Sequence, residues 1–441
     1  MKQAYDFFAQ SPLLGLDFPS LESVALYYEN RAPQTLPLLA RKDSGQESPV
    51  RFERQGFSLP DPRATPGVSN LQLVHLFDPR RLDVLVCDAV QDQVLVLRPY
   101  DESPTLKILA KGFCCAHAEV LDLDGDGIKD ILLACLGSFY ATDDRVGSVV
   151  WLKGSADGTF TPIPLLEGVG RVADVQAADF RGNGKLDLIV AVFGWRQTGE
   201  ILYLENRTTD WSKPVFVPRV LDQRHGAIHV PVADLNKDGR PDFVALISQE
   251  HETVVAFLNQ GNGEFRKETI YTAPHPAFGS SGIQLIDLDG DGNLDVLLTN
   301  GDSLDAPYLL KPYHGIAWLE NRRSFPFVYH RILDLYGAMR AVAGDVVGNG
   351  KRDIIAVSFL PAETFPQRTA LQLESIVLLE QTAPGTFVRH PLERVRCDHL
   401  TCALGDLTAN GKTDLVVGNF TKGTTKSPAI EIWKNLGRKP N

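Results

Sequence analysis

The sequence predicts an all-β protein: a seven-bladed β-propeller with four-stranded antiparallel blades, its ring closed by an N-terminal strand. Three observations predict this fold. A short Asp-rich segment recurs along the chain, and the spacing of its copies suits four short strands and their loops. The last copy lacks one strand, and the N-terminal region supplies a segment of the missing pattern.

The recurring segment is a turn rich in Asp and Gly between two apolar stretches. LDLDGDGIKDILLA from Leu121 and IDLDGDGNLDVLLT from Ile286 are two copies, and LFDPRRLDVLVC from Leu76 is a shortened first one. The six full copies have leading aspartates that recur at intervals of 53 to 61 residues, namely Asp122, Asp179, Asp234, Asp287, Asp345 and Asp406. Each copy therefore marks one of seven blades.

Each unit contains the pattern of four strands. An alternating run leads into the turn and a solid apolar run such as ILLA leaves it, which predicts two antiparallel strands joined by a tight turn. A third strand follows, as in SVVWLKG, and then a fourth with the pattern Gly-x-Phe, as in NGEFRKETI. The last unit ends at its third strand, AIEIWKN, whereas FERQGFSLP from Phe52 has the Gly-x-Phe pattern. We expect this segment to close the ring and to cover an exposed sheet edge.

Composition bounds the class of protein. With 44% hydrophobic and 22% charged residues the chain is globular, and no apolar run approaches the roughly 18 residues that a membrane span needs. A net charge of -11 without a basic stripe argues against nucleic acid as a partner. Six cysteines without metal-ligand spacing do not predict a disulfide scaffold.

The domain boundaries and the compartment follow from the same observations. We expect a propeller over residues 51–437 after an N-terminal extension over residues 1–50. The first residues lack the features of a secretory signal. We therefore expect a soluble protein that is cytoplasmic, or periplasmic or secreted after a signal has been removed.

The repeated pattern D-x-D-x-D-G-x-x-D between two strands resembles the FG-GAP/VCBS repeat, and the resemblance extends from about Phe52 to Gly437. A single copy would also resemble an EF-hand loop. An EF-hand needs flanking helices and a bidentate Glu at position 12, which this pattern lacks. The resemblance therefore implies a propeller.

Carboxylates at alternate positions of a turn are the hard oxygen ligands that Ca²⁺ prefers. Three turns retain them, and we expect structural Ca²⁺ in blades 2, 4 and 5. The predicted ligands are Asp122, Asp124, Asp126 and Asp130 in blade 2, Asp234, Asn236, Asp238 and Asp242 in blade 4, and Asp287, Asp289, Asp291 and Asp295 in blade 5. The corresponding turns of blades 3, 6 and 7 have lost acids at the third and fifth positions, so these turns lack the charge to hold a cation. Polar turns without an ion are the alternative.

The first strand of each blade lines the centre of a propeller, and alternation predicts which of its side chains face inward. Counting back from the leading aspartates places a polar set there: His75, His117, Glu119, Asp174, Gln176, His229, Gln284 and Arg340. Imidazoles and carboxylates that converge from different blades suit Zn²⁺ or another divalent metal, with His117 and His229 as ligands. The alternative is a polar channel that is merely solvated.

Long loops on the rim around this centre carry aromatic and polar side chains, which suit a small carbohydrate ligand. The predicted catalytic residues are His117, Glu119, Asp174, His229 and Arg340. The predicted substrate-binding residues are His75, Gln176, Trp195, His225, Gln284, Tyr313 and His314.

Two classes of function remain open. The polar centre resembles the propeller domain of the fungal aldos-2-ulose and anhydrofructose dehydratases, which are metal-dependent lyases that act on oxidised sugars. This resemblance implies His117 and His229 as metal ligands and Glu119 or Asp174 as ligand or base, although the cupin and lectin-like parts of the aldos-2-ulose enzyme are absent here. The alternative is a non-catalytic module that binds a carbohydrate or a protein, as integrin heads and lectins do.

Overall fold

The computed structural model describes residues 19–30, 36–39, 46–304, 308–422 and 427–439. The chain divides into two compact units, Met1–Ala40 and Arg41–Asn441. The described helix of the first unit is α2 (Leu21–Glu29), and Ser20 Oγ accepts a hydrogen bond from Ser23 N at 3.2 Å where it begins. Most of the predicted extension over residues 1–50 lies outside the described residues.

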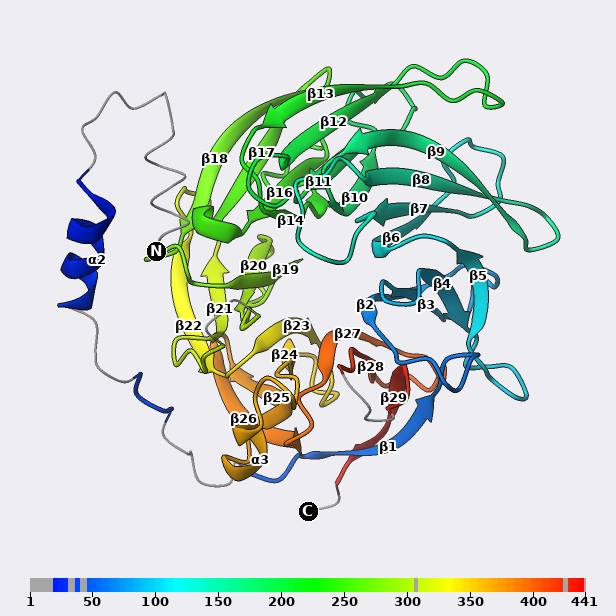
Figure 1. Ribbon diagram of the computed structural model, residues 1–441. Helices are drawn as coiled ribbons and strands as arrows, with labels where there is room; N and C mark the ends of the chain where they lie inside the picture. Colours follow the sequence, from blue (N-terminus) through cyan, green and yellow to red (C-terminus); the bar gives the residue numbers. More distant parts are fainter. Residues whose placement is uncertain (1–18, 31–35, 40–45, 305–307, 423–426, 440–441) are drawn as a thin grey trace. The chain divides into compact units, whose positions relative to one another are not determined.

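The second unit contains seven antiparallel sheets arranged around a common centre (Figure 1), which confirms the predicted all-β propeller. The innermost strands are β2 (Val68–Val74), β6 (Cys115–Leu121), β10 (Val172–Ala178), β14 (Ala227–His229), β19 (Ser280–Ile286), β23 (Ala338–Gly344) and β27 (His399–Gly405). The second strands are β3 (Asp83–Asp88), β7 (Asp130–Cys135), β11 (Asp187–Val192), β16 (Asp242–Ile247), β20 (Asp295–Asn300), β24 (Asp353–Ser358) and β28 (Asp414–Asn419). In blade 4 the short strand β15 (Val232–Ala233) also pairs with β16.

The outer half of each blade is formed by two further strands. The third strands are β4 (Gln93–Leu97), β8 (Gly147–Gly154), β12 (Glu200–Asn206), β17 (Thr253–Gly261), β21 (Gly315–Glu320), β25 (Glu374–Ala383) and β29 (Ile430–Arg438). The outermost strands are β5 (Lys107–Lys111), β9 (Phe160–Val169), β13 (Phe216–Asp222), β18 (Glu264–Thr272), β22 (Val328–Asp334), β26 (Thr386–Arg394) and β1 (Val50–Phe57). Two short helices, η1 (Gln249–His251) and α3 (Gln367–Ala370), lie in loops.

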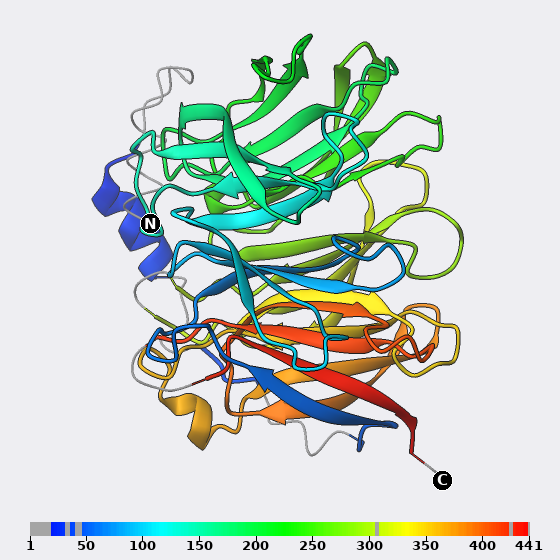
Figure 2. The same ribbon diagram turned by 90° about the vertical axis from the view of Figure 1, so that its right-hand side faces the viewer.

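The seventh sheet combines the two ends of the propeller. β1 pairs antiparallel with β29, from Phe57 opposite Ile430 to Val50 opposite Arg438. The two strands lie side by side in both views of the ribbon (Figures 1 and 2). The first strand of the propeller thereby covers the edge that β29 would otherwise expose.

The hydrophobic core lies between neighbouring blades. Leu132 and Trp151 of blade 2, for example, pack with Val175 and Val190 of blade 3, and all four are at most 3% exposed. Every residue of β7 is buried because both faces of the sheet are covered by other sheets. The solid apolar runs of the sequence are these second strands.

A buried aspartate at the start of the second strand ties each turn to its blade. In blade 2, Asp130 accepts hydrogen bonds from Leu123 N at 2.9 Å and from Gly154 N, in the third strand, at 2.8 Å. Equivalent bonds recur at Asp242, Asp295, Asp353 and Asp414. The last aspartate of the repeated pattern therefore has a structural role of its own, independent of any ion.

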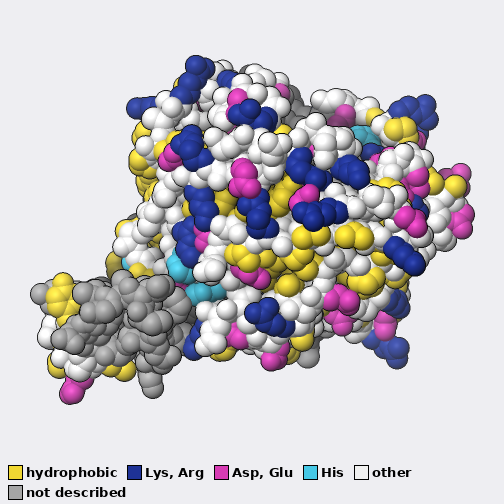
Figure 3. Space-filling view, turned by 90° about the horizontal axis from the view of Figure 1, so that it is seen from above, with side chains coloured by type: hydrophobic (Ala, Val, Ile, Leu, Met, Phe, Trp, Pro, Cys, Tyr) yellow, Lys and Arg dark blue, Asp and Glu magenta, His cyan; other side chains and the backbone are white. Residues whose placement is uncertain are grey.

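Charges are mixed on the face seen in Figure 3, where Lys and Arg side chains lie among Asp, Glu and hydrophobic ones. Ion pairs such as Lys267–Asp222, at 3.0 Å, occupy basic side chains of the outer strands. Among the described residues, no helix has the length and apolar character that a membrane crossing requires.

Candidate functional site

A β-bulge in each innermost strand positions the residues at the centre of the propeller. The pairing of β6 with β7 shifts between Cys115 and His117, and that of β10 with β11 shifts between Val172 and Asp174. A bulge changes the direction in which the next side chain points. The residue after the bulge is Asn70, His117, Asp174, His229, Gly282, Arg340 or Thr401 in blades 1 to 7.

His117 lies between two carboxylates. Its Nε2 is 3.3 Å from Asp174 Oδ1 in the neighbouring blade and 3.6 Å from Glu119 Oε2 in its own strand. His117 is 8% exposed and Asp174 is 2% exposed, so the contact between them is largely shielded from solvent. An imidazolium is the form of His117 that this surrounding stabilises.

Asp174 also connects His117 to blade 4. Its Oδ2 accepts a hydrogen bond from Val230 N at 2.8 Å and lies 3.9 Å from His229 Nδ1. One carboxylate is therefore flanked by two histidines from different blades. The structure thus brings His117, Asp174 and His229, three of the predicted central residues, together.

Arg340 reaches this group from blade 6. Its Nη1 lies 3.4 Å from His229 Nε2, although blade 5 stands between the two strands. Blade 5 presents Gly282 at the central position, and a Cβ there would lie 3.2 Å from Arg340 Nη1 and 3.3 Å from its Cδ. The missing side chain of Gly282 makes room for the arginine.

The two histidines have pKa values displaced in opposite directions. Burial alone would lower the pKa of His117, but the carboxylates of Asp174 and Glu119 outweigh it and raise that pKa. Burial, followed by the charge of Arg340, lowers the pKa of His229 to about 3. At neutral pH the centre therefore contains a neutral imidazole, and beside it an imidazole that holds its proton more tightly than usual.

Glutamines form a second layer next to the histidines. The side-chain amides of Gln72 and Gln176 lie 3.2 and 3.0 Å from His117 Nε2. Gln284 Oε1 accepts a hydrogen bond from Ala343 N at 2.7 Å, so its carbonyl oxygen joins blade 5 to blade 6 and only its amide N–H groups face other partners.

Blade 1 contributes Gln72 to the centre, and the sequence prediction of His75 there is wrong. His75 is exposed in the turn after β2, where its Nδ1 lies 2.9 Å from Arg81 O. Leu76 N donates to Asp83 as Leu123 N donates to Asp130, so His75 occupies the place of a leading aspartate. Counting back from Asp83 would have identified Gln72.

The predicted rim residues make their contacts within the rim loops. His225 and His314 are 3% and 0% exposed, with His225 Nε2 3.1 Å from Glu250 Oε2 and His314 Nδ1 3.3 Å from Ser303 Oγ. Tyr313 donates its hydroxyl hydrogen to Ala277 O at 3.0 Å. The Arg196 guanidinium lies 4.1 Å from the centroid of the Trp195 ring.

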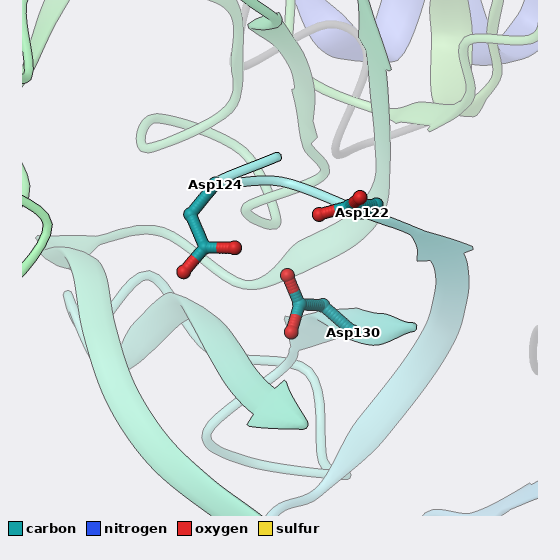
Figure 4. A group of neighbouring side chains, drawn as sticks. All are labelled: Asp122, Asp124 and Asp130. Atoms are coloured by element: carbon teal, nitrogen blue, oxygen red, sulfur yellow. The ribbon is translucent and has the colours of Figure 1, made fainter. Parts of the chain in front are cut away.

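Two of the predicted calcium turns bring three carboxylates together. Asp122, Asp124 and Asp130 in blade 2 point toward one another (Figure 4), as do Asp287, Asp289 and Asp295 in blade 5, with ligand oxygens within 4.8 Å in each group. Within the described residues these are the groups of three or more acidic, His or Cys ligands that meet this limit. Neither group includes His117 or His229.

The fifth positions of these turns, Asp126 and Asp291, lie outside the two groups of three. Each accepts a backbone hydrogen bond within its turn, from Ile128 N and Asn293 N, at 2.9 and 2.7 Å. These two carboxylates therefore shape the turns.

Neighbouring cations distinguish the two triads and the turn of blade 4. Lys153 Nζ contacts Asp124 and lies 3.1 Å from Asp126 in blade 2. The equivalent residue of blade 5 is Glu320. In blade 4, Asn236 Nδ2 donates to Asp238 at 3.1 Å, and Arg240 pairs with Asp238 at 2.5 Å. Blade 5 is consequently the most acidic of the three turns.

Blade 3 contains a cation of its own in the turn. Arg181 stands where blade 2 has Asp124, and its guanidinium donates to both oxygens of the buried Asp187, at 2.8 and 2.9 Å, and to Glu205 at 2.9 Å. A basic side chain thus neutralises the turn.

Known proteins are similar to the chain in repeat and in fold. Residues 122–190 and 234–298 match a family model described as an FG-GAP-like repeat, and these stretches include both aspartate triads. No curated protein matches the sequence.

Two solved structures are similar over most of the chain. One is a crystal structure of BBS1N in complex with ARL6DN, soaked with lead, with a TM-score of 0.52 and 10% identity, covering 89% of this chain and 99% of that one. The other is selenomethionine-substituted virginiamycin B lyase from Staphylococcus aureus, with a TM-score of 0.49 and 10% identity, covering 87% and 99%. The first likeness concerns the fold alone, and the second carries no weight for function.

Proposed function

This chain is a seven-bladed β-propeller built on FG-GAP-like repeats, and from this premise we propose that it is a calcium-stabilised lyase that acts on an oxidised sugar at its centre. The observation that carries the proposal is the pair His117 and His229 around Asp174. Neighbouring titratable groups whose surroundings move their pKa values apart are suited to act as acid and base in one reaction.

The charge states of the two histidines indicate which one acts as the base and which one as the acid. His229 is neutral at physiological pH and can accept a proton from the carbon next to a carbonyl group. His117, whose imidazolium form is stabilised by Asp174 and Glu119, can donate a proton to the oxygen that leaves the neighbouring carbon. The C–H and C–O bonds break, a C=C bond forms, and the leaving oxygen departs as a hydroxyl compound.

Arg340 supplies the positive charge that such an elimination needs at the carbonyl oxygen. Its guanidinium lies next to His229, the proposed base, at 3.4 Å. A divalent metal between His117 and His229, predicted from the sequence, would have to share this space with the guanidinium. The charge of Arg340 therefore favours a reaction assisted by arginine, and the metal stays a prediction.

A sugar suits the remaining polar groups. The amides of Gln72, Gln176 and Gln284, from blades 1, 3 and 5, offer polar groups that sugar hydroxyls could bind, with Gln284 contributing its N–H donors. The resemblance of the polar centre to the sugar dehydratases supports the same class of substrate. A non-catalytic carbohydrate-binding module is the alternative.

Calcium in blades 2 and 5 would neutralise the two aspartate triads. Asp130 and Asp295 are 0% and 1% exposed, and burial raises the pKa of both, that of Asp295 to about 6. Clustered carboxylates that are costly to ionise favour a bound cation with oxygen ligands. Bound Ca²⁺ would hold the turn against its blade.

The test compares turnover with metal content. Oxidised sugars are screened for elimination through the absorbance of the unsaturated product, with wild type, His117→Gln, His229→Gln and the outer-strand control His330→Gln. We expect each central substitution to lower kcat/KM by about 100-fold to 10,000-fold while the control retains activity. Binding without turnover in the wild type would instead establish the binding module.

Elemental analysis of the same four proteins shows which metal ions each of them contains. We expect calcium in all four proteins and no transition metal at stoichiometric level. Zinc that disappears on substitution of His117 and His229 would restore the metal-dependent mechanism.

A further inference from the structure

Arg340 is a partly buried cation without an acidic partner. Within the described residues, no carboxylate oxygen lies within 4.0 Å of its guanidinium nitrogens, and its hydrogen-bond contact is His229 Nε2. Arg368 and Arg181, in contrast, lie 2.8 Å from Asp398 and Asp187, whereas the part-buried Arg171 donates to the backbone carbonyl oxygens of Ser138 and Phe139. A cation removed from bulk water without a counter-ion is costly, and proteins retain such groups where a ligand supplies the opposite charge.

The nearby acids are committed elsewhere. Asp174 accepts a hydrogen bond from Val230 N and contacts His117, and Glu119 also lies within 3.6 Å of His117. Both carboxylates therefore lie on the side of blades 2 and 3. Arg340 reaches the centre from blade 6, so the cluster has an acidic side and a basic side.

The position of the Arg340 side chain depends on Gly282 in the neighbouring blade. Its side chain passes the Cα of Gly282, where any Cβ would lie 3.0 Å from Thr299 Oγ1 and 3.2 Å from Arg340 Nη1. Contacts this short require each neighbour to shift by a few tenths of an ångström. An alanine at position 282 would therefore displace the guanidinium without removing its charge.

We propose that Arg340 binds the carboxylate of a sugar acid, so that the substrate is a uronate or aldonate rather than a neutral keto-sugar. A planar guanidinium matches a carboxylate with two parallel hydrogen bonds. The carboxylate then points to blade 6, which places the carbon beside it next to His229 and the leaving oxygen toward His117.

The reaction step of this inference rests on the proposed function, whereas the binding of a carboxylate by Arg340 does not. In the reaction, His229 takes the proton from the carbon that bears the carboxylate. The electron pair of that C–H bond forms the C=C bond, the C–O bond at the next carbon breaks, and the leaving oxygen takes the proton of His117. The product is an unsaturated sugar acid, and the charge that develops on the carboxylate during proton removal is stabilised by Arg340.

The first experiment measures binding without turnover. D-glucuronate and D-glucose differ in the carboxylate, and each is titrated into the full chain by calorimetry or ligand-observed NMR at low salt. We expect D-glucuronate to bind at least tenfold more tightly than D-glucose. Arg340→Met should abolish that difference, and Arg340→Lys should restore part of it. Arg322→Met, at an exposed arginine paired with Glu320, is the control and should behave as wild type.

Gly282→Ala keeps the result interpretable if Arg340→Met fails to fold. It retains the charge and should still weaken D-glucuronate binding, because the guanidinium is displaced. Equal binding of the two sugars to wild type, or unchanged D-glucuronate binding in a folded Gly282→Ala or Arg340→Met protein, would overturn the carboxylate site.

The remaining outcomes separate this inference from the proposed function. Selective binding of D-glucuronate by a protein that converts no oxidised sugar supports the carboxylate site and refutes the lyase. Elimination from a neutral keto-sugar that persists in Arg340→Met supports the lyase and refutes the carboxylate site. His229→Gln, which should lose turnover and keep D-glucuronate binding, supports both.

Discussion

At the scale of single residues, the surroundings of each side chain decide its chemistry more than its type does. His117 and His229 follow the same bulge in successive blades, yet one lies between two carboxylates and the other beside a guanidinium. Aspartates differ in the same way. Asp174 contacts two histidines, whereas Asp130 accepts two backbone hydrogen bonds.

The opposite pKa displacements predict how stability depends on pH. The pKa of His117 is raised, so its contribution to stability is complete below 6.5 and is lost as the pH rises through the folded-state value. The pKa of His229 is lowered to about 3, so its contribution is present above 6.5 and is lost as the pH falls toward that value.

Urea unfolding between pH 4 and pH 9 measures both effects. Relative to His117→Gln, wild type should lose stability above neutral pH. Relative to His229→Gln, it should lose stability below pH 6.5, with a slope that approaches about 1.4 kcal/mol per pH unit. Parallel curves for wild type and both variants would show that these histidines do not differ in pKa between the folded and unfolded states.

At the scale of elements, the turns of the repeat differ in how the negative charge of their acidic side chains is balanced. Blade 3 balances it with Arg181, and blade 2 has Lys153 against its triad. Among the described residues no Lys or Arg nitrogen lies within 4.0 Å of the blade 5 triad, and Glu320 stands at the position of Lys153. Glu320 is itself paired with Arg322 at 2.8 Å and with His330 at 2.7 Å.

These differences predict unequal calcium affinities. Lys153 competes with an ion at Asp124, so Lys153→Met should raise the Ca²⁺ affinity of blade 2 by roughly tenfold, the effect of removing one partly screened charge. Lys434→Met is the matched control, because Lys434 occupies the equivalent position in blade 7. Calorimetry of wild type and both variants checks this.

The blade 5 site should also respond to acid. Because the pKa of Asp295 is about 6, protons should compete with Ca²⁺ as the pH falls through that value. An affinity that is constant from pH 8 to pH 5, or an equal gain in Lys434→Met, would contradict this account of the turns.

At the scale of the whole molecule, the sheet made of β27, β28, β29 and β1 joins the two ends of the ring. β1 contributes a full antiparallel register to β29. Without β1, the outer strand of the last blade would expose its backbone groups and the hydrophobic surface beneath it.

Two truncations test this closure. A protein that begins at residue 58 lacks β1 and should melt at a lower temperature, less cooperatively, and should associate through the open edge. A protein that begins at residue 41 lacks the first compact unit only and should melt as the full chain does. Scanning calorimetry with light scattering compares them, and equal melting of both truncated proteins would rule out a closing role for β1.

The repeat made the architecture predictable, because each copy specifies a turn, a buried strand and a spacing. The centre was predictable in part. Alternation identified His117, Asp174, His229 and Arg340, but it could not show that Arg340 crosses blade 5, since that depends on the space above Gly282. Gln72 was missed because the short first repeat shifts the count.

Gly282 has a consequence for how a ligand could lie in the ring. Seven similar blades offer a bound molecule seven nearly equivalent orientations, and choosing one of them costs RT ln 7, about 1 kcal/mol. The absent side chain of Gly282 in blade 5 lets the Arg340 guanidinium of blade 6 reach His229 in blade 4, so that the centre acquires a direction. The ring can thus hold an asymmetric molecule in a single pose while its frame stays repetitive.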